Sequence, residues 1–98
     1  MLWHIACLDI PNSGDKRASM LHAHRDYLDS HNNIMFFAGP LQSDDGATNI
    51  GSVFIINANT REEALAFSQN EVFTKAGLFS SVTITRLLKR RFNPELAN

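Results

Sequence analysis

Two histidines, His22 and His24, lie two residues apart in the stretch MLHAHRDYL, and imidazoles at short spacing can bind a metal or transfer protons. Successive residues of a helix turn by about 100°, so side chains at i and i+2 point to opposite faces. Histidines that share a metal ion on one helix stand at i, i+3 or i, i+4 instead. The spacing therefore predicts no metal pair, and no other cluster of His and Cys residues suggests a metal site.

The two histidines belong to different faces of the predicted helix. His22 shares its face with two aspartates and is expected to lie in water, whereas His24 falls within the apolar stripe. Arg17 lies beside that stripe, and a buried imidazole or guanidinium needs a polar partner. One interpretation is a polar pocket between this helix and a sheet. The other is a core histidine that serves packing alone, with Arg17 extending past the helix end.

The elements that position these residues follow the hydrophobic pattern of the chain. Short apolar runs bounded by turn residues predict strands, and longer amphipathic stretches predict helices. Thr60, with Glu63 three residues later, forms a capping box typical of a helix start. Gly39–Pro40 is expected to end the second strand, because proline cannot donate to a ladder. The expected strands are 2–8, 34–42, 51–58 and 80–88, the expected helices are 13–33 and 59–70, and 71–79 is expected to be a turn.

This order predicts a ferredoxin-like βαββαβ fold of the α+β class, with two helices on a four-stranded antiparallel sheet. A sheet with one face in water should alternate apolar and polar residues. The middle strands instead carry the apolar runs 34–37 and 53–56. Two helices cover only one face, so we expect the other to pack against a second copy, as a homodimer or higher homo-oligomer. The alternative is that these residues pack at strand ends or under the C-terminal tail.

Composition narrows the class of protein. The 98 residues suffice for one domain, expected over 1–92, with a tail of 93–98. A net charge of −1 gives no reason to expect nucleic acid or a membrane surface as partner, and no apolar run approaches the roughly 20 residues of a membrane helix. The N-terminus does not read as a signal peptide. The single cysteine, Cys7, forbids an internal disulfide and fits a cytoplasmic location.

An ordered set of motifs resembles the YciI-like (YCII-related) family. The motifs are CLDIPNSGDKRASMLHAHRDYL, then AGPL, then GSVFII, and finally REEALAFSQNEVFTKAGLF. The resemblance covers about 2–92. It implies a ferredoxin-like subunit that assembles as a dimeric α+β barrel, with an acid–base site centred on a His–Asp pair.

Carried over by position, the family's catalytic histidine corresponds to His24, and the aspartate that closes its first strand corresponds to Asp9. Where the family commonly has Asp-Pro and an aromatic residue, this chain has Glu71, a valine and a phenylalanine. Glutamate keeps the charge but adds a methylene, and valine releases the fixed geometry of proline. Asp9 and Glu71 therefore both stand as candidates for the carboxylate beside His24, and the pair can also be displaced or absent.

The other positions carried over are candidates for substrate binding. An arginine can hold a carboxylate or enolate in a bidentate fork, and backbone amides near a glycine can approach a developing oxyanion. These candidates are Arg17, Gly39, Pro40, Gly51 and Ser52.

Such a site favours proton transfer beside a carbonyl, as an isomerase or lyase acting on a small organic acid or ketone without metal or cofactor. The first alternative is a dimer that binds or senses a small ligand without chemistry. The second is a haem-binding relative with His24 as axial ligand, which the short chain and the crowded helix face oppose. The third is RNA binding on strand aromatics, but GSVFIINA lacks the basic residue of that pattern.

Overall fold

The computed structural model describes residues 1–97, and its element order is that of a ferredoxin-like α+β fold, as the sequence predicts. Asn98, the last residue of the expected tail, lies outside the described residues. The strands are β1 (Leu2–Asp9), β2 (Met35–Gln42), β3 (Asn49–Asn57) and β4 (Phe79–Leu87). The helices are α1 (Gly14–Ser19), α2 (Leu21–Ser30), α3 (Arg61–Asn70) and α4 (Val72–Lys75), with 3-10 turns at Asn32–Ile34 and Pro94–Leu96.

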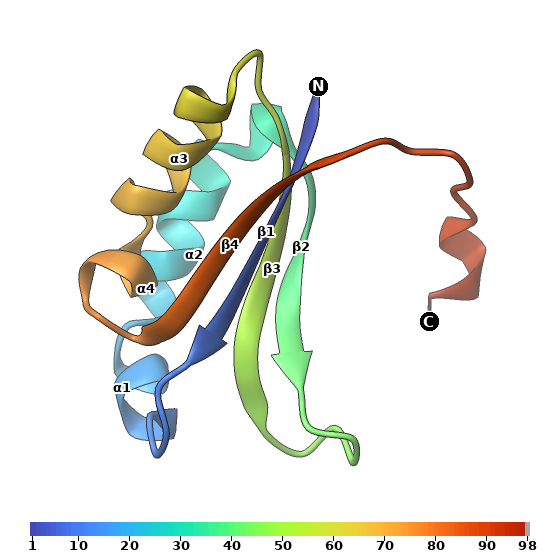
Figure 1. The fold of residues 1–98 in the computed structure, drawn as a ribbon. Coiled ribbons are helices and arrows are strands. Elements are labelled where there is room, and N and C mark those ends of the chain that lie inside the picture. The colour runs from blue at the N-terminus through green and yellow to red at the C-terminus, as the bar shows by residue number, and fades with distance from the viewer. Residues whose placement is uncertain (98) are drawn as a thin grey trace.

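The four strands form one antiparallel sheet in the order β2-β3-β1-β4, with the α-helices on one face (Figure 1). Each strand–helix–strand unit leaves a gap of one strand, which an antiparallel neighbour fills. Alternate side chains of β1 and β3 point towards the helices and form the centre of the core, where Ile5 lies opposite Phe54. Ser52 of β3 lies on this side of the sheet, within hydrogen-bond distance of Arg17.

The first helical stretch is not one continuous helix, so the prediction of a single helix over 13–33 is wrong. The helix is interrupted at Met20. The N–H group of this residue donates to the carbonyls of Arg17 and Ala18 at the end of α1. The Ser19 hydroxyl donates to the Lys16 carbonyl at 2.8 Å, a local bond that competes with helix continuation. The break separates Arg17, on α1, from His24, on α2.

The expected range of 34–42 agrees with β2, but Gly39–Pro40 lies within this strand, so the prediction that the proline ends it is wrong. β2 continues to Gln42, with Pro40 opposite Ser52 of β3. β2 is an edge strand, where a residue without an N–H need not interrupt the ladder. The segment 71–79, expected to be a turn, contains the short helix α4. The predicted start of α3 is confirmed, because Thr60 Oγ1 accepts from the Glu63 N–H.

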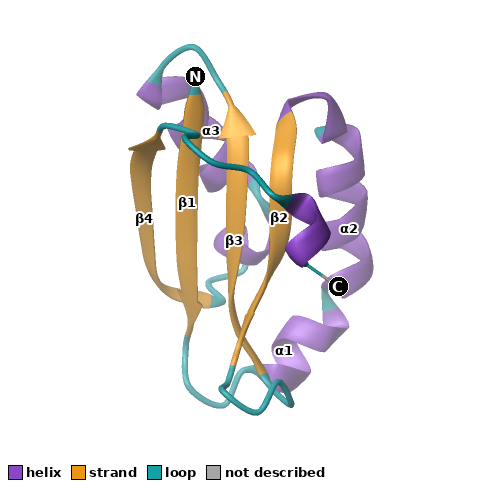
Figure 2. Ribbon diagram, turned by 90° about the vertical axis from the view of Figure 1, so that its right-hand side faces the viewer, coloured by secondary structure: helices purple, strands orange, loops and turns teal. Residues whose placement is uncertain are grey.

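The face of the sheet away from the helices is turned towards the viewer in Figure 2. The exposed apolar side chains on this face include Leu8 and Phe37. The C-terminal segment crosses this face, and the Phe92 ring lies 5.3 Å from that of Phe36. No helix among residues 1–97 is long and apolar enough to span a membrane.

Gly51 offers a test of the close packing between β1 and β3. A Cβ at this position would lie 2.2 Å from the Cys7 carbonyl oxygen on the neighbouring strand, and backbone within a sheet cannot move aside cheaply. We expect Gly51→Ala to lower the free energy of unfolding by about 1–3 kcal/mol, measured by urea denaturation. Gly14→Ala is the matched control, since its Cβ would meet nothing within 4 Å. Equal stability of the two variants would contradict this packing.

Candidate active site

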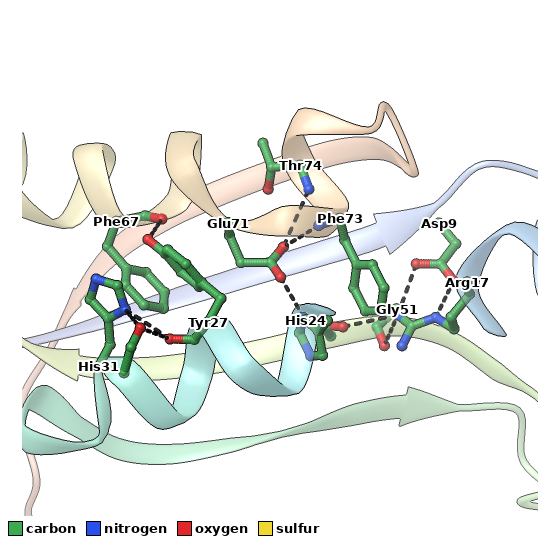
Figure 3. Close-up of polar contacts among 12 residues, drawn as sticks. Asp9, Arg17, His24, Tyr27, His31, Gly51, Phe67, Glu71, Phe73 and Thr74 are labelled. Carbon is green, nitrogen blue, oxygen red and sulfur yellow. Dashed lines mark hydrogen bonds and ion pairs between the residues drawn. The ribbon is translucent and has the colours of Figure 1, made fainter. Parts of the chain in front are cut away.

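A histidine and a glutamate meet at the centre of the site. Nδ1 of His24, on α2, contacts Oε1 of Glu71, which stands directly before α4 (Figure 3). The Glu71 side chain is 0% exposed and that of His24 is 10% exposed. The second carboxylate oxygen accepts the N–H groups of Phe73 at 3.0 Å and Thr74 at 3.2 Å. Glu71 therefore caps α4 and orients the His24 ring with the same carboxylate.

The buried carboxylates influence the groups around them. Burial, together with the negative charges of Glu71 and Asp9, raises the pKa of the Cys7 thiol to about 12. Burial and the charge of Glu71 also raise the pKa of Tyr27. Cys7 is thus a protonated core side chain at neutral pH and not an activated nucleophile.

Phe73 packs against the side chains of both His24 and Arg17. Its ring stacks on the His24 imidazole, with centroids 4.0 Å apart and planes inclined by 10°. The Arg17 guanidinium lies over the same phenyl ring at 4.7 Å from its centroid, and Phe73 stands between the two side chains in Figure 3. Phe73 thus fixes the plane of the imidazole from the side of α4.

Asp9 pairs with Arg17. The guanidinium donates from Nε to Oδ2 at 2.8 Å and from Nη2 to Oδ1 at 3.1 Å, and both side chains are buried. Nη2 also donates to the Gly51 carbonyl at 2.7 Å and to Ser52 Oγ at 2.9 Å. Of the two candidate carboxylates, Glu71 contacts the His24 ring, while Asp9 holds the arginine.

A cavity of about 220 Å³ opens between α1, α2 and the strands β2 and β3. Among the predicted site residues, Asp9, Gly51 and Glu71 do not line this cavity. The predicted residues that line it are Arg17, His24, Gly39, Pro40 and Ser52, and the other polar lining residues are Arg25 and Asn49.

Two polar atoms of the site are left for a ligand. Neither Nε2 of His24 nor Nη1 of Arg17 has a hydrogen-bond partner among residues 1–97. Among the side-chain nitrogen and oxygen atoms of residues 1–97 that are buried, the one without a hydrogen-bond partner is Oγ1 of Thr74. Nε2 and Nη1 also lack a partner, but they are not among the buried atoms. Nε2 and Nη1 are therefore accessible, and both belong to side chains that line the cavity.

The prediction that the two histidines lie on different faces of the helix is confirmed. His22 is exposed and lies 3.4 Å from Asp26, whereas His24 is buried. Within the described chain, no three His, Cys, Asp or Glu side chains gather as a metal-binding group would.

Sequence reasoning missed Phe73 as a packing partner of the imidazole, and Arg25 and Asn49 as lining residues. Arg25 follows Leu21 by four positions, so the helical repeat already places it beside a residue of the apolar stripe. Asn49 precedes the predicted third strand, and no local pattern marks it.

This fold and site define a small α+β protein with a buried histidine–glutamate pair beside a cavity. The family model of the YCII-related domain matches residues 1–88, and the chain belongs to this family. The resemblance found in the motifs is thereby confirmed. The expected domain end at residue 92 stays a prediction.

Among solved structures, the chain is similar to 5-chloro-2-hydroxyhydroquinone dehydrochlorinase (TftG) from Burkholderia phenoliruptrix, in complex with 2,5-dihydroxybenzoquinone. The two share 32% sequence identity over 90% of this chain and 94% of that chain, with a TM-score of 0.85. No curated protein matches the sequence.

The ion pair between Asp9 and Arg17 predicts that substitution of Asp9 lowers the free energy of unfolding. Asp9→Asn would leave the buried Arg17 guanidinium without its carboxylate, which should cost about 3–5 kcal/mol of unfolding free energy. Chemical denaturation measures this loss. Asp26→Asn, which removes the exposed carboxylate beside His22, serves as control and should change stability by less than about 1 kcal/mol. Similar stabilities of the two variants would refute a structural role for the Asp9 pair.

Proposed function

We propose that this protein is an acid–base enzyme that transfers a proton on a small organic acid or ketone, and thereby either eliminates a leaving group from this substrate or isomerises it. The observation that carries the proposal is the state of His24, with Nδ1 held by a buried carboxylate and Nε2 open to a cavity. A carboxylate on Nδ1 favours the tautomer with its proton there, which leaves a lone pair on Nε2. Nε2 is then the general base, and as imidazolium it is the general acid.

The reaction needs a base and a site for developing negative charge. Nε2 of His24 takes a proton from a C–H or O–H group of the substrate, and the released electron pair forms a new double bond. In elimination, the leaving group departs with the electrons of its own bond. In isomerisation, the imidazolium returns the proton to another carbon. Nη1 of Arg17 donates to the substrate oxygen that gains charge, and Glu71 stabilises the imidazolium.

The similar dehydrochlorinase supports elimination as the reaction. Its name describes removal of hydrogen chloride from a hydroxylated ring, and its bound molecule is a single ring with oxygen substituents. The cavity of about 220 Å³ lies below the roughly 300–1,000 Å³ of pockets for drug-sized ligands and suits one ring. We therefore propose hydroxylated single-ring compounds, in their ketone or enol forms, as the substrate class.

His24→Gln tests this function directly. Chloride release from 5-chloro-2-hydroxyhydroquinone should fall about 10²–10⁴-fold, because glutamine cannot exchange protons near neutral pH. Glu71→Gln keeps an oxygen for the α4 cap but loses the charge, and should lower turnover by about tenfold or more. His22→Gln makes the same change on the exposed face and should leave turnover intact.

The outcomes separate the alternatives. If the wild type binds ring compounds but turns none over, the protein is a ligand-binding dimer without chemistry. If His24→Gln mainly lowers the melting temperature, the histidine serves the core alone.

We also propose that two copies pack through the open faces of their sheets, since Leu8 and Phe37 are each about half exposed there. Light scattering should then give twice the chain mass of 11.0 kDa. Phe37→Glu should yield a monomer, because the charge would be buried without a partner. Leu65→Glu, on an exposed site of α3, should leave the dimer intact. A wild-type monomer at micromolar concentration would reject the assembly.

A further inference from the structure

We propose that Arg25 determines the substrate specificity of this cavity by selecting ligands that carry a delocalised oxyanion, such as an ionised hydroxyquinone or a carboxylate. This inference rests on the proposed function and adds to it the charge of the substrate. Arg25 belongs neither to the histidine–glutamate pair nor to the network around Arg17.

The helical repeat directs Arg25 to the cavity. Leu21, Arg25 and Leu28 follow one another at i, i+4 and i+7 on α2, and all three line the cavity. Arg25 is exposed, whereas the two leucines beside it are half-buried. Arg25 is therefore both a lining residue and exposed to water, on the same helix as the His24 ring.

The charges around the cavity leave one cation unmatched. Arg17 is neutralised by Asp9 in a bidentate pair. The Glu71 charge lies behind the imidazole and is taken up by two N–H groups of α4. No Asp or Glu side chain lines the cavity, and across residues 1–97 Arg25 has no carboxylate within 4.0 Å. An anion that enters the cavity thus meets the Arg25 cation, which has no carboxylate partner among residues 1–97.

The chemistry of the proposed substrates fits this arrangement. A hydroxyquinone is a vinylogous carboxylic acid, so its anion shares charge between two oxygens across a conjugated system. A planar guanidinium matches such an oxygen pair with parallel N–H donors. Removal of a further proton by His24 would add negative charge to the ring, which a cation that lines the cavity also stabilises.

Isothermal titration with two ligands of similar size tests the proposal. At neutral pH, 2,5-dihydroxybenzoquinone is an anion and hydroquinone is neutral. Arg25→Gln should weaken binding of the anion about five- to tenfold and leave binding of hydroquinone unchanged. Arg25→Lys keeps the charge and should recover most of the loss. Lys16→Gln removes an exposed charge that does not line the cavity and should have no effect.

Turnover gives an independent measurement. With 5-chloro-2-hydroxyhydroquinone, Arg25→Gln should lower kcat/KM, because the guanidinium stabilises the negative charge that the ring gains when His24 removes a proton, and added salt should shrink the difference from wild type.

The outcomes distinguish this inference from the proposed function. If Arg25→Gln weakens both ligands equally or neither, the selection of anions is refuted, while loss of turnover in His24→Gln would still support the acid–base reaction. If Arg25→Gln behaves as expected but His24→Gln keeps full turnover, the acid–base proposal fails and the anion site stands. Failure of the wild type to bind either ligand would overturn both the anion site and the proposed ligand class.

Discussion

The burial of one carboxylate organises the site. Glu71 has no contact with water, and an isolated charge in such a place would be prohibitively costly. Two backbone N–H groups of α4 and the imidazole of His24 compensate for that cost. The interaction joins the helix that carries the histidine to the helix that carries Phe73, so it sets both the direction of the ring and the aromatic surface beneath it.

An ion pair between Arg17 and Asp9 stabilises the framework of the site. The pair between Arg17 and Asp9 ties α1 to the end of β1, and the same guanidinium reaches β3 through Gly51 and Ser52. The two carboxylates therefore have different partners: one neutralises the arginine and the other orients the histidine. The break at Met20 allows α1 to bring Arg17 into the sheet while α2 presents His24.

The sequence predicts those features that depend on local periodicity. The order of the strands, the two faces of the first helical stretch and the separation of His22 from His24 all follow from residue spacing. The choice between Asp9 and Glu71 does not, because it depends on how segments distant in the chain approach each other. The role of Pro40 depends on its strand being at the sheet edge, which no residue near it encodes. Periodicity does not mark Arg25 as a cavity residue, because it lies between the exposed and the buried faces of α2.

The shortness of α4 has a consequence for the dynamics of the molecule. Four residues form few internal hydrogen bonds, so this helix can open as a local event while the sheet and the longer helices persist. Opening would release the Phe73 and Thr74 amides together with the Glu71 carboxylate, and the imidazole would lose its orientation in the same step. The geometry of the pocket therefore depends on the equilibrium between the closed and the open state of α4, and the fully buried Phe73 ring favours the closed state. Amide hydrogen exchange at the two α4 amides reports on that equilibrium.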